Sequence, residues 1–164
     1  MMHEVEIDLF GQNNCRCVVY ENPDNNPITI QFKGRSYNNV TVYRPLQEVI
    51  PTSLQPQAHQ CVKNAFYVGR YFGYNVVEGA ILVLNDGGYC IEPHCWNLFD
   101  GIYLDVTPFE EEPQDIMYFP FRTYEFRMYA DRFGGDTSLY TFLSGNQILQ
   151  FCDEIRATMR PNAN

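Results

Sequence analysis

Three residues near the middle of the chain carry side chains that could together activate a thiol. Cys61, His94 and Asp105 follow one another in that order. A cysteine is a nucleophile once it loses its proton, an imidazole can exchange that proton, and a carboxylate can orient the imidazole. This set of groups indicates attack on an acyl carbon, and it leaves the substrate open.

The residues around Cys61 have the spacing of an amphipathic helix. Small and apolar side chains recur at intervals of three and four, at Ala58, Cys61, Val62, Ala65, Phe66 and Gly69. Pro56 is typical of a helix start and Gly73 of a helix end. We therefore predict a helix over residues 58–71 that has Cys61 in its first turn, where the positive end of the helix favours a thiolate.

His94 and Asp105 fall on two neighbouring predicted strands. Strand patterns over 75–85, 89–97 and 102–107 are separated by a turn at 85–88 and by another that ends at Gly101. Antiparallel strands joined by a short turn make His94 and Asp105 cross-strand neighbours. The contact between Cys61 and His94 does not follow from spacing, because it requires the helix to pack against these strands.

Ordinary packing is the competing interpretation of each residue. A cysteine on an apolar helical face is commonly a small core residue. His94 follows Pro93 and comes two residues before Trp96. An ordinary strand residue in this setting does not need a charged imidazole. Asp105 is disfavoured among strand residues and requires a partner if it is buried. The coincidence of all three favours a catalytic interpretation.

The segment from His94 to Pro108, HCWNLFDGIYLDVTP, resembles the His-x-Trp-Asn … Gly … Asp-x-Thr signature of the transglutaminase-like superfamily, part of the papain-like group of thiol enzymes. The positions that match this signature are His94, Trp96, Asn97, Asp105 and Thr107. The likeness covers roughly residues 55–108, and Cys61 matches the family's nucleophile in chain order and setting. It implies that Cys61 is the nucleophile, His94 the general base and acid, and Asp105 the group that orients His94.

A thiol enzyme also requires hydrogen-bond donors for the oxyanion. The backbone N–H of Cys61 is one candidate. Gln55, six residues upstream, resembles the glutamine that precedes the cysteine in papain-type enzymes, and Gln57 and Gln60 are alternatives. Trp96 is a candidate wall of the site, with core packing as the other interpretation.

Length and pattern predict one α+β domain over residues 1–164. We expect a β-rich part at 1–50, the catalytic-type core at 55–108, and a strand with a C-terminal helix at 116–164. In the first part, GQNN is predicted as a turn, and KGRSYN as the hairpin connection between strands ITIQF and NVTVY. Pro120 is expected to interrupt the strand after the acidic loop, and 146–160 is the predicted last helix. The resulting fold is an antiparallel sheet with a nucleophile-bearing helix, of transglutaminase/papain-like type.

Composition argues against several other classes. The net charge of −9 disfavours nucleic-acid binding, and no apolar run approaches the length of a membrane span. The N-terminus lacks the pattern of a signal peptide, so we expect cytoplasmic localisation and six reduced cysteines. The acidic run from Glu110 to Glu112 is interpreted as a solvated loop.

Two alternatives to an active thiol enzyme remain open at this stage. Zinc could use soft ligands such as those in this region, but their spacing is not that of common zinc sites, and we predict no metal and no cofactor; the candidate ligands are His59, Cys61, Cys90, His94 and Cys95. A catalytically inactive domain that binds a protein or ligand is the second alternative. If the triad is active, the expected partner is a protein or peptide substrate or a small amide, and hydrolysis, deamidation and acyl transfer are equally compatible with it. Arylamine acyltransferases use the same residue order, yet the chain has no Gly-rich loop for a coenzyme.

Overall fold

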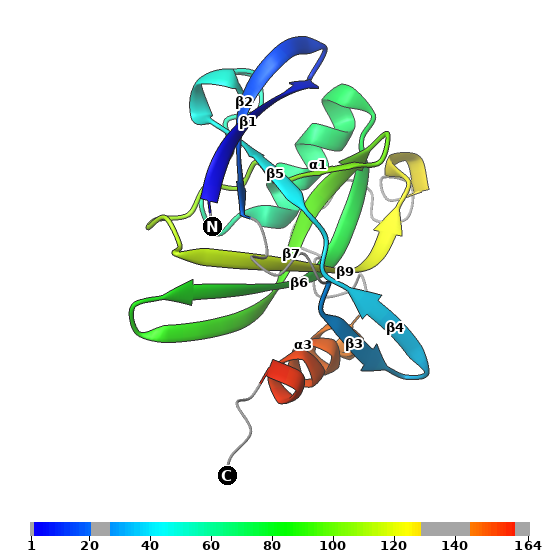
Figure 1. The fold of residues 1–164 in the computed structure, drawn as a ribbon. Helices are drawn as coiled ribbons and strands as arrows, with labels where there is room; N and C mark the ends of the chain where they lie inside the picture. The colour runs from blue at the N-terminus through cyan, green and yellow to red at the C-terminus, as the bar shows by residue number, and fades with distance from the viewer. Residues whose placement is uncertain (1, 21–26, 129–144, 160–164) are drawn as a thin grey trace.

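A large sheet organises the molecule, as Figure 1 shows for the computed structural model, which describes residues 2–20, 27–128 and 145–159. Its seven strands lie in the order β1 (Met2–Leu9), β2 (Gln12–Tyr20), β5 (Val42–Pro45), β8 (Ile102–Leu104), β7 (Gly88–Phe99), β6 (Asn75–Asn85) and β9 (Asp115–Tyr124). Only the β5–β8 pairing is parallel. The predicted mixture of helices with a mostly antiparallel sheet is therefore confirmed.

Smaller elements surround the large sheet in the described part of the chain. They are the two-stranded sheet of β3 (Thr29–Phe32) and β4 (Arg35–Asn38), the short helix η1 (Gln47–Val49), and the helices α1 (Cys61–Phe72) and α3 (Asn146–Met159). The last helix agrees with its prediction to within one residue.

The β6–β7 hairpin is the centre of the sheet. Its strands pair from Asn75 with Leu98 to Asn85 with Gly88, so the predicted turn is confirmed. Alternation along β6 divides its side chains between two cores. Val76, Ala80 and Leu82 pack on the side of α1 and α3, whereas Val77 and Ile81 pack with Trp96 and Tyr118 on the other side.

Helix α1 lies between this hairpin and the β1–β2 hairpin (Figure 1). Val62, Ala65 and Phe66 face the central strands, and Val68 packs with the core of the β1–β2 side. The helix begins at Cys61 and not at residue 58, because His59 has a positive φ of 63° that is incompatible with a helix. It ends as predicted at Gly73, whose φ of 72° is the left-handed conformation that glycine tolerates best.

Two predictions in the N-terminal region are wrong. The turn between β1 and β2 is Phe10–Gly11, both at positive φ, and most of the GQNN segment belongs to β2. KGRSYN is not a connection between the two strands that were expected to pair. Lys33 and Gly34 form a tight turn at positive φ, and Arg35–Asn38 return as β4 against β3. NVTVY instead contributes β5, which pairs with β8 and β2 of the large sheet.

The strand β9 passes through Pro120 without ending, contrary to the prediction. Its pairing with β6 shifts register between Glu78 and Gly79, opposite the proline. As an edge strand with an irregularity at this point, β9 tolerates the missing N–H. Gly79 is needed here, since a Cβ would lie 2.3 Å from the Phe119 carbonyl oxygen and 2.5 Å from the Trp96 ring. The loop predicted at FGGDTS lies outside the described residues.

Candidate active site

Cys61 is the first residue of α1 and is half-buried. The first helical backbone hydrogen bond runs from the N–H of Asn64 to the carbonyl of Gln60, so the N–H groups of the first turn point out of the helix start. Their partial positive charge favours a negative sulfur at this position. All six cysteines are free thiols.

The structure brings His94 and Asp105 into direct contact. His94 lies on β7, and Asp105 follows β8, where its N–H bonds to the carbonyl of Tyr43 at 3.0 Å. His94 Nε2 is 2.9 Å from Asp105 Oδ2, and both side chains are buried. Because Nε2 is occupied by the carboxylate, Nδ1 is the ring nitrogen that remains for a partner on the other side.

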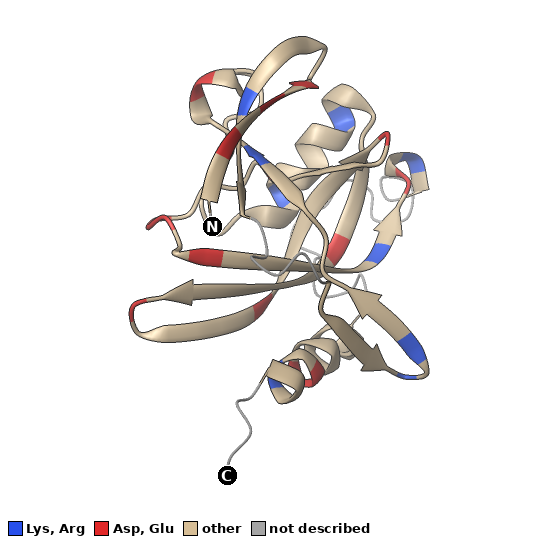
Figure 2. Cartoon of the chain, in the orientation of Figure 1, with Lys and Arg blue, Asp and Glu red and all other residues tan. Residues whose placement is uncertain are grey.

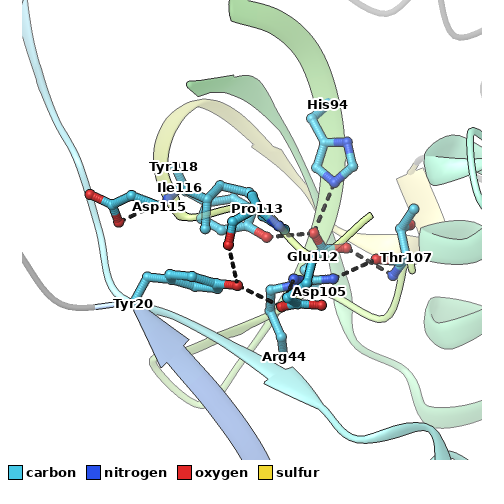
Figure 3. A network of polar contacts seen from close by, with 10 residues as sticks. All are labelled: Tyr20, Arg44, His94, Asp105, Thr107, Glu112, Pro113, Asp115, Ile116 and Tyr118. Atoms are coloured by element: carbon cyan, nitrogen blue, oxygen red, sulfur yellow. Dashed lines mark hydrogen bonds and ion pairs between the residues drawn. The ribbon is translucent and has the colours of Figure 1, made fainter. Parts of the chain in front are cut away.

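The buried carboxylate of Asp105 has two further donors, as Figure 3 shows. The Tyr118 hydroxyl donates to Oδ2 at 2.7 Å, and the Thr107 N–H donates to Oδ1 at 3.0 Å. A buried charge needs such partners to offset the loss of water. Burial raises the pKa of Asp105, but His94, Arg44 and Tyr118 outweigh it and lower the pKa below its ordinary value.

A second layer of polar side chains lies behind Asp105 (Figure 3). The Arg44 guanidinium is buried, donates to the Thr107 carbonyl at 3.1 Å and lies 3.4 Å from a Glu112 oxygen. The Tyr20 hydroxyl donates to the same Glu112 oxygen at 2.5 Å. The Arg44 charge also faces the Phe109 ring at 4.2 Å. This layer fixes the segment that follows Asp105 and leaves the carboxylate turned toward His94.

Cys61 lies beside two neighbouring residues of β7, His94 and Cys95. Hydrogen bonding from Cys95 and the charge of His94 lower the pKa of Cys61 to about 4 against the effect of burial. Burial would lower the pKa of His94, but the charges of Asp105 and Cys61 outweigh it and raise that pKa to about 10. A thiolate and an imidazolium are therefore the favoured pair near neutral pH.

Two asparagines connect the helix to the strands of the site. Asn64 donates from Nδ2 to the Thr107 hydroxyl at 2.9 Å, and it exchanges two hydrogen bonds with the backbone of Gln57. Asn97 donates from Nδ2 to the Ala65 carbonyl at 2.9 Å. These bonds couple the position of α1, which begins at Cys61, to that of the segment carrying Asp105.

Cys61 and His94 line one surface depression. Its other walls are His59, Glu92, Pro93, Thr107, Pro108, Phe109 and Glu110. His59 Nε2 lies 3.2 Å from a Glu110 oxygen at the rim, with both side chains exposed. Figure 2 places acidic residues on the loop before β9 and on the β6–β7 turn, at the same end of the molecule. The depression therefore brings Cys61 to the surface, whereas Asp105 remains buried.

The structure does not bring every candidate residue to this depression. Gln55 is exposed and lines another hollow with Gln47, Ile50 and Pro51. Gln60 is exposed at the N-cap of α1, directly before the nucleophile. Trp96 is buried, and its ring lies 6.1 Å from that of His94, so it supports the imidazole from the core.

Sequence reasoning did not point to Tyr118, Arg44 or Asn64, and it considered Cys95 only as a possible zinc ligand. Tyr118 lies in a strand pattern that resembles any β-rich segment, Arg44 directly follows the predicted strand NVTVY, and nothing in their spacing relates them to Asp105. Thr107 carried a signal through the resemblance, and the structure places it between Asp105, Asn64 and Arg44.

Two further properties concern the described residues alone. No group of three or more His, Cys, Asp or Glu side chains among residues 2–20, 27–128 and 145–159 is arranged to hold a metal ion. Within the same ranges, no helix has both the length and the apolar character needed to cross a membrane. In comparisons with protein-family models, curated proteins and solved structures, nothing matches this chain.

Proposed function

We propose that this protein is a cysteine-dependent enzyme that acts on an amide or related acyl bond through Cys61, His94 and Asp105. The observation that carries the proposal is the buried His94–Asp105 pair at 2.9 Å, placed beside a half-buried cysteine at a helix start. Those are the groups, and the order of contacts, that activate a thiol nucleophile. The finer fold assignment, a transglutaminase/papain-like core, belongs to the same proposal.

The reaction proceeds in two halves. The Cys61 thiolate attacks the carbonyl carbon, and the backbone N–H of Cys61 faces the developing oxyanion. The His94 imidazolium then gives its proton to the leaving amine as the carbon–nitrogen bond breaks, which leaves a thioester on Cys61. Neutral His94 removes a proton from water or from an amine, which attacks the thioester and releases the thiolate. Water gives hydrolysis or deamidation, and an amine gives acyl transfer.

The decisive experiment is the pH dependence of iodoacetamide alkylation at Cys61, read by peptide mass spectrometry. In the parent protein, Cys61 should react well below neutral pH, because its pKa is lowered to about 4. His94→Ala removes the positive ring and should slow alkylation at pH 6 by roughly tenfold or more, since the thiolate population falls. The five other cysteines serve as internal controls in every digest.

Enzymatic turnover should follow a bell-shaped pH profile. The acidic limb reflects protonation of the Cys61 thiolate near its pKa of about 4, and the alkaline limb reflects loss of the His94 proton near its pKa of about 10. Between these values the thiolate and the proton donor coexist. A Cys61 that stays unreactive until the chain unfolds would contradict the proposal and favour a binding domain without catalysis.

A further inference from the structure

Cys95 is a buried thiol that lies beside the site and has no part in the scheme above. Its side chain is fully buried, at 0% exposure, and it packs with Val62, Ala65 and Val76 in the core between α1 and β7. Cys61 packs against the same cluster. In this apolar core, the acceptor for the Cys95 S–H proton must come from a neighbouring residue.

The register between α1 and β7 indicates which residue lies next to Cys95. Asn97 donates to the Ala65 carbonyl at 2.9 Å, which places the two residues side by side. Cys61 lies four residues before Ala65, about 6 Å along the helix. Cys95 lies two residues before Asn97 on the same face of the strand, about 6.6 Å away. Cys61 packs against the cluster that contains Cys95, so the two cysteines are neighbours along this interface.

The edge of β7 is also open at this point. Its neighbour β8 pairs only with Asn97, Leu98 and Phe99, so the strand carries no β8 partner at Cys95. Cys61 packs beside this stretch of β7, against the buried cluster that contains Cys95. His94, the preceding residue of β7, lines the same depression as Cys61.

We propose that Cys95 is a second catalytic residue, whose S–H group donates a hydrogen bond to the Cys61 thiolate and holds the sulfur beside His94. The inference rests on the proposed function, since it concerns the same thiolate. Burial raises the pKa of Cys95 well above its ordinary value, and the nearby Cys61 sulfur raises it further, so Cys95 keeps its proton over the working pH range. One thiol therefore acts as the donor and the other as the nucleophile.

The test compares the alkylation pH profile of Cys61 in the parent with those of three variants of Cys95. Cys95→Ala and Cys95→Val both remove the donor, and the valine fills the space should the alanine variant fail to fold. We expect each to raise the apparent pKa of Cys61 by about one pH unit, the effect of a hydrogen bond to a charged group at the lower end of its range. Cys95→Ser keeps a donor and should remain closer to the parent.

Cys152→Ala is the matched control, because Cys152 is a buried thiol in the separate core under α3. It should leave the Cys61 profile unchanged, and circular dichroism should show that every variant is folded. A profile that stays at the parent value in folded Cys95→Ala or Cys95→Val would overturn the inference. Failure of the proposed function is distinguishable, because it would show as an unreactive Cys61 in the parent protein itself.

Discussion

Helices α1 and α3 both pack on the β6–β7 hairpin, and each presents one cysteine to it. Cys61 and Cys152 nevertheless have opposite properties. The pKa of Cys61 is lowered to about 4, whereas burial raises that of Cys152 to about 11 despite the nearby Arg156. Both thiols lie at the junction of a helix and the sheet, so burial alone does not decide which becomes a thiolate.

The difference lies in position and in partners. Cys61 opens its helix and contacts His94 and Cys95, whereas Cys152 is in the interior of α3 among Ile148, Phe151 and Ile155. The side chain of a mid-helix residue lies away from the free N–H groups of the first turn. Desolvation raises the pKa of Cys152 more than the charge of Arg156 lowers it. The interface between α1 and β7 therefore stabilises a charged sulfur, whereas the core under α3 holds a neutral thiol.

The contrast between Cys61 and Cys152 is tested most strongly by replacing each thiol in turn. Cys61→Ser should reduce turnover by more than about 10³-fold, because the hydroxyl is a poor nucleophile in a site that is matched to a thiolate. Cys152→Ser should leave turnover near the parent value. Release of p-nitrophenolate from p-nitrophenyl acetate, with mass spectrometry to locate the acetyl group, measures both. An acetyl group on Cys152 and none on Cys61 would reverse the assignment.

The second test concerns the Asp105 carboxylate, which contacts His94 near Cys61. Asp105→Ala should slow turnover by about 10²-fold at neutral pH, since His94 loses both its orientation and the charge that raises its pKa. Asp105→Asn is the matched control, because it keeps an acceptor oxygen for His94 and should retain more activity. Its alkaline limit should fall below pH 10, since the negative charge is gone. Equal activity in the parent and Asp105→Ala would remove Asp105 from the mechanism.

A smaller effect is expected from Tyr118→Phe. The change deletes the 2.7 Å hydrogen bond to Asp105 and should cost about 1.5 kcal/mol of folding free energy, as for other hydrogen bonds to charged groups. Turnover should fall only a few-fold, because His94 and Thr107 still hold the carboxylate. Urea denaturation followed by fluorescence gives the stability. Tyr37→Phe, in the core under α3, is the comparison variant and should be nearly neutral.

The smallest change is expected from Cys152→Ala. It removes one buried sulfur from the α3 core and should cost about 1 kcal/mol of stability, the lower range for deleting a buried group. Neither turnover nor the alkylation profile of Cys61 should change. A shift in either would mean that the two cores are coupled through β7.

The amino-acid pattern was sufficient for the local elements that carry the site. Three-and-four spacing and Gly73 indicated α1 and its end, and the asparagine- and glycine-containing turn indicated the β6–β7 hairpin. It was insufficient where strand partners had to be chosen. The segment ITIQF was predicted to pair with NVTVY, but it pairs with Arg35–Asn38 across the Lys33–Gly34 turn, and NVTVY supplies β5 beside β8.

The sequence by itself determined the residue types that can perform the chemistry and the local elements that present them. It placed Cys61 at a helix start and put His94 and Asp105 on successive strand patterns, because periodicity and turns act over a few residues. Only the tertiary structure decided that α1 packs on β7, that Cys95 meets the Cys61 sulfur, and that Tyr118 and Arg44 enclose Asp105. Those contacts join residues far apart in the chain, and they arise from burying apolar faces together, which no local spacing specifies.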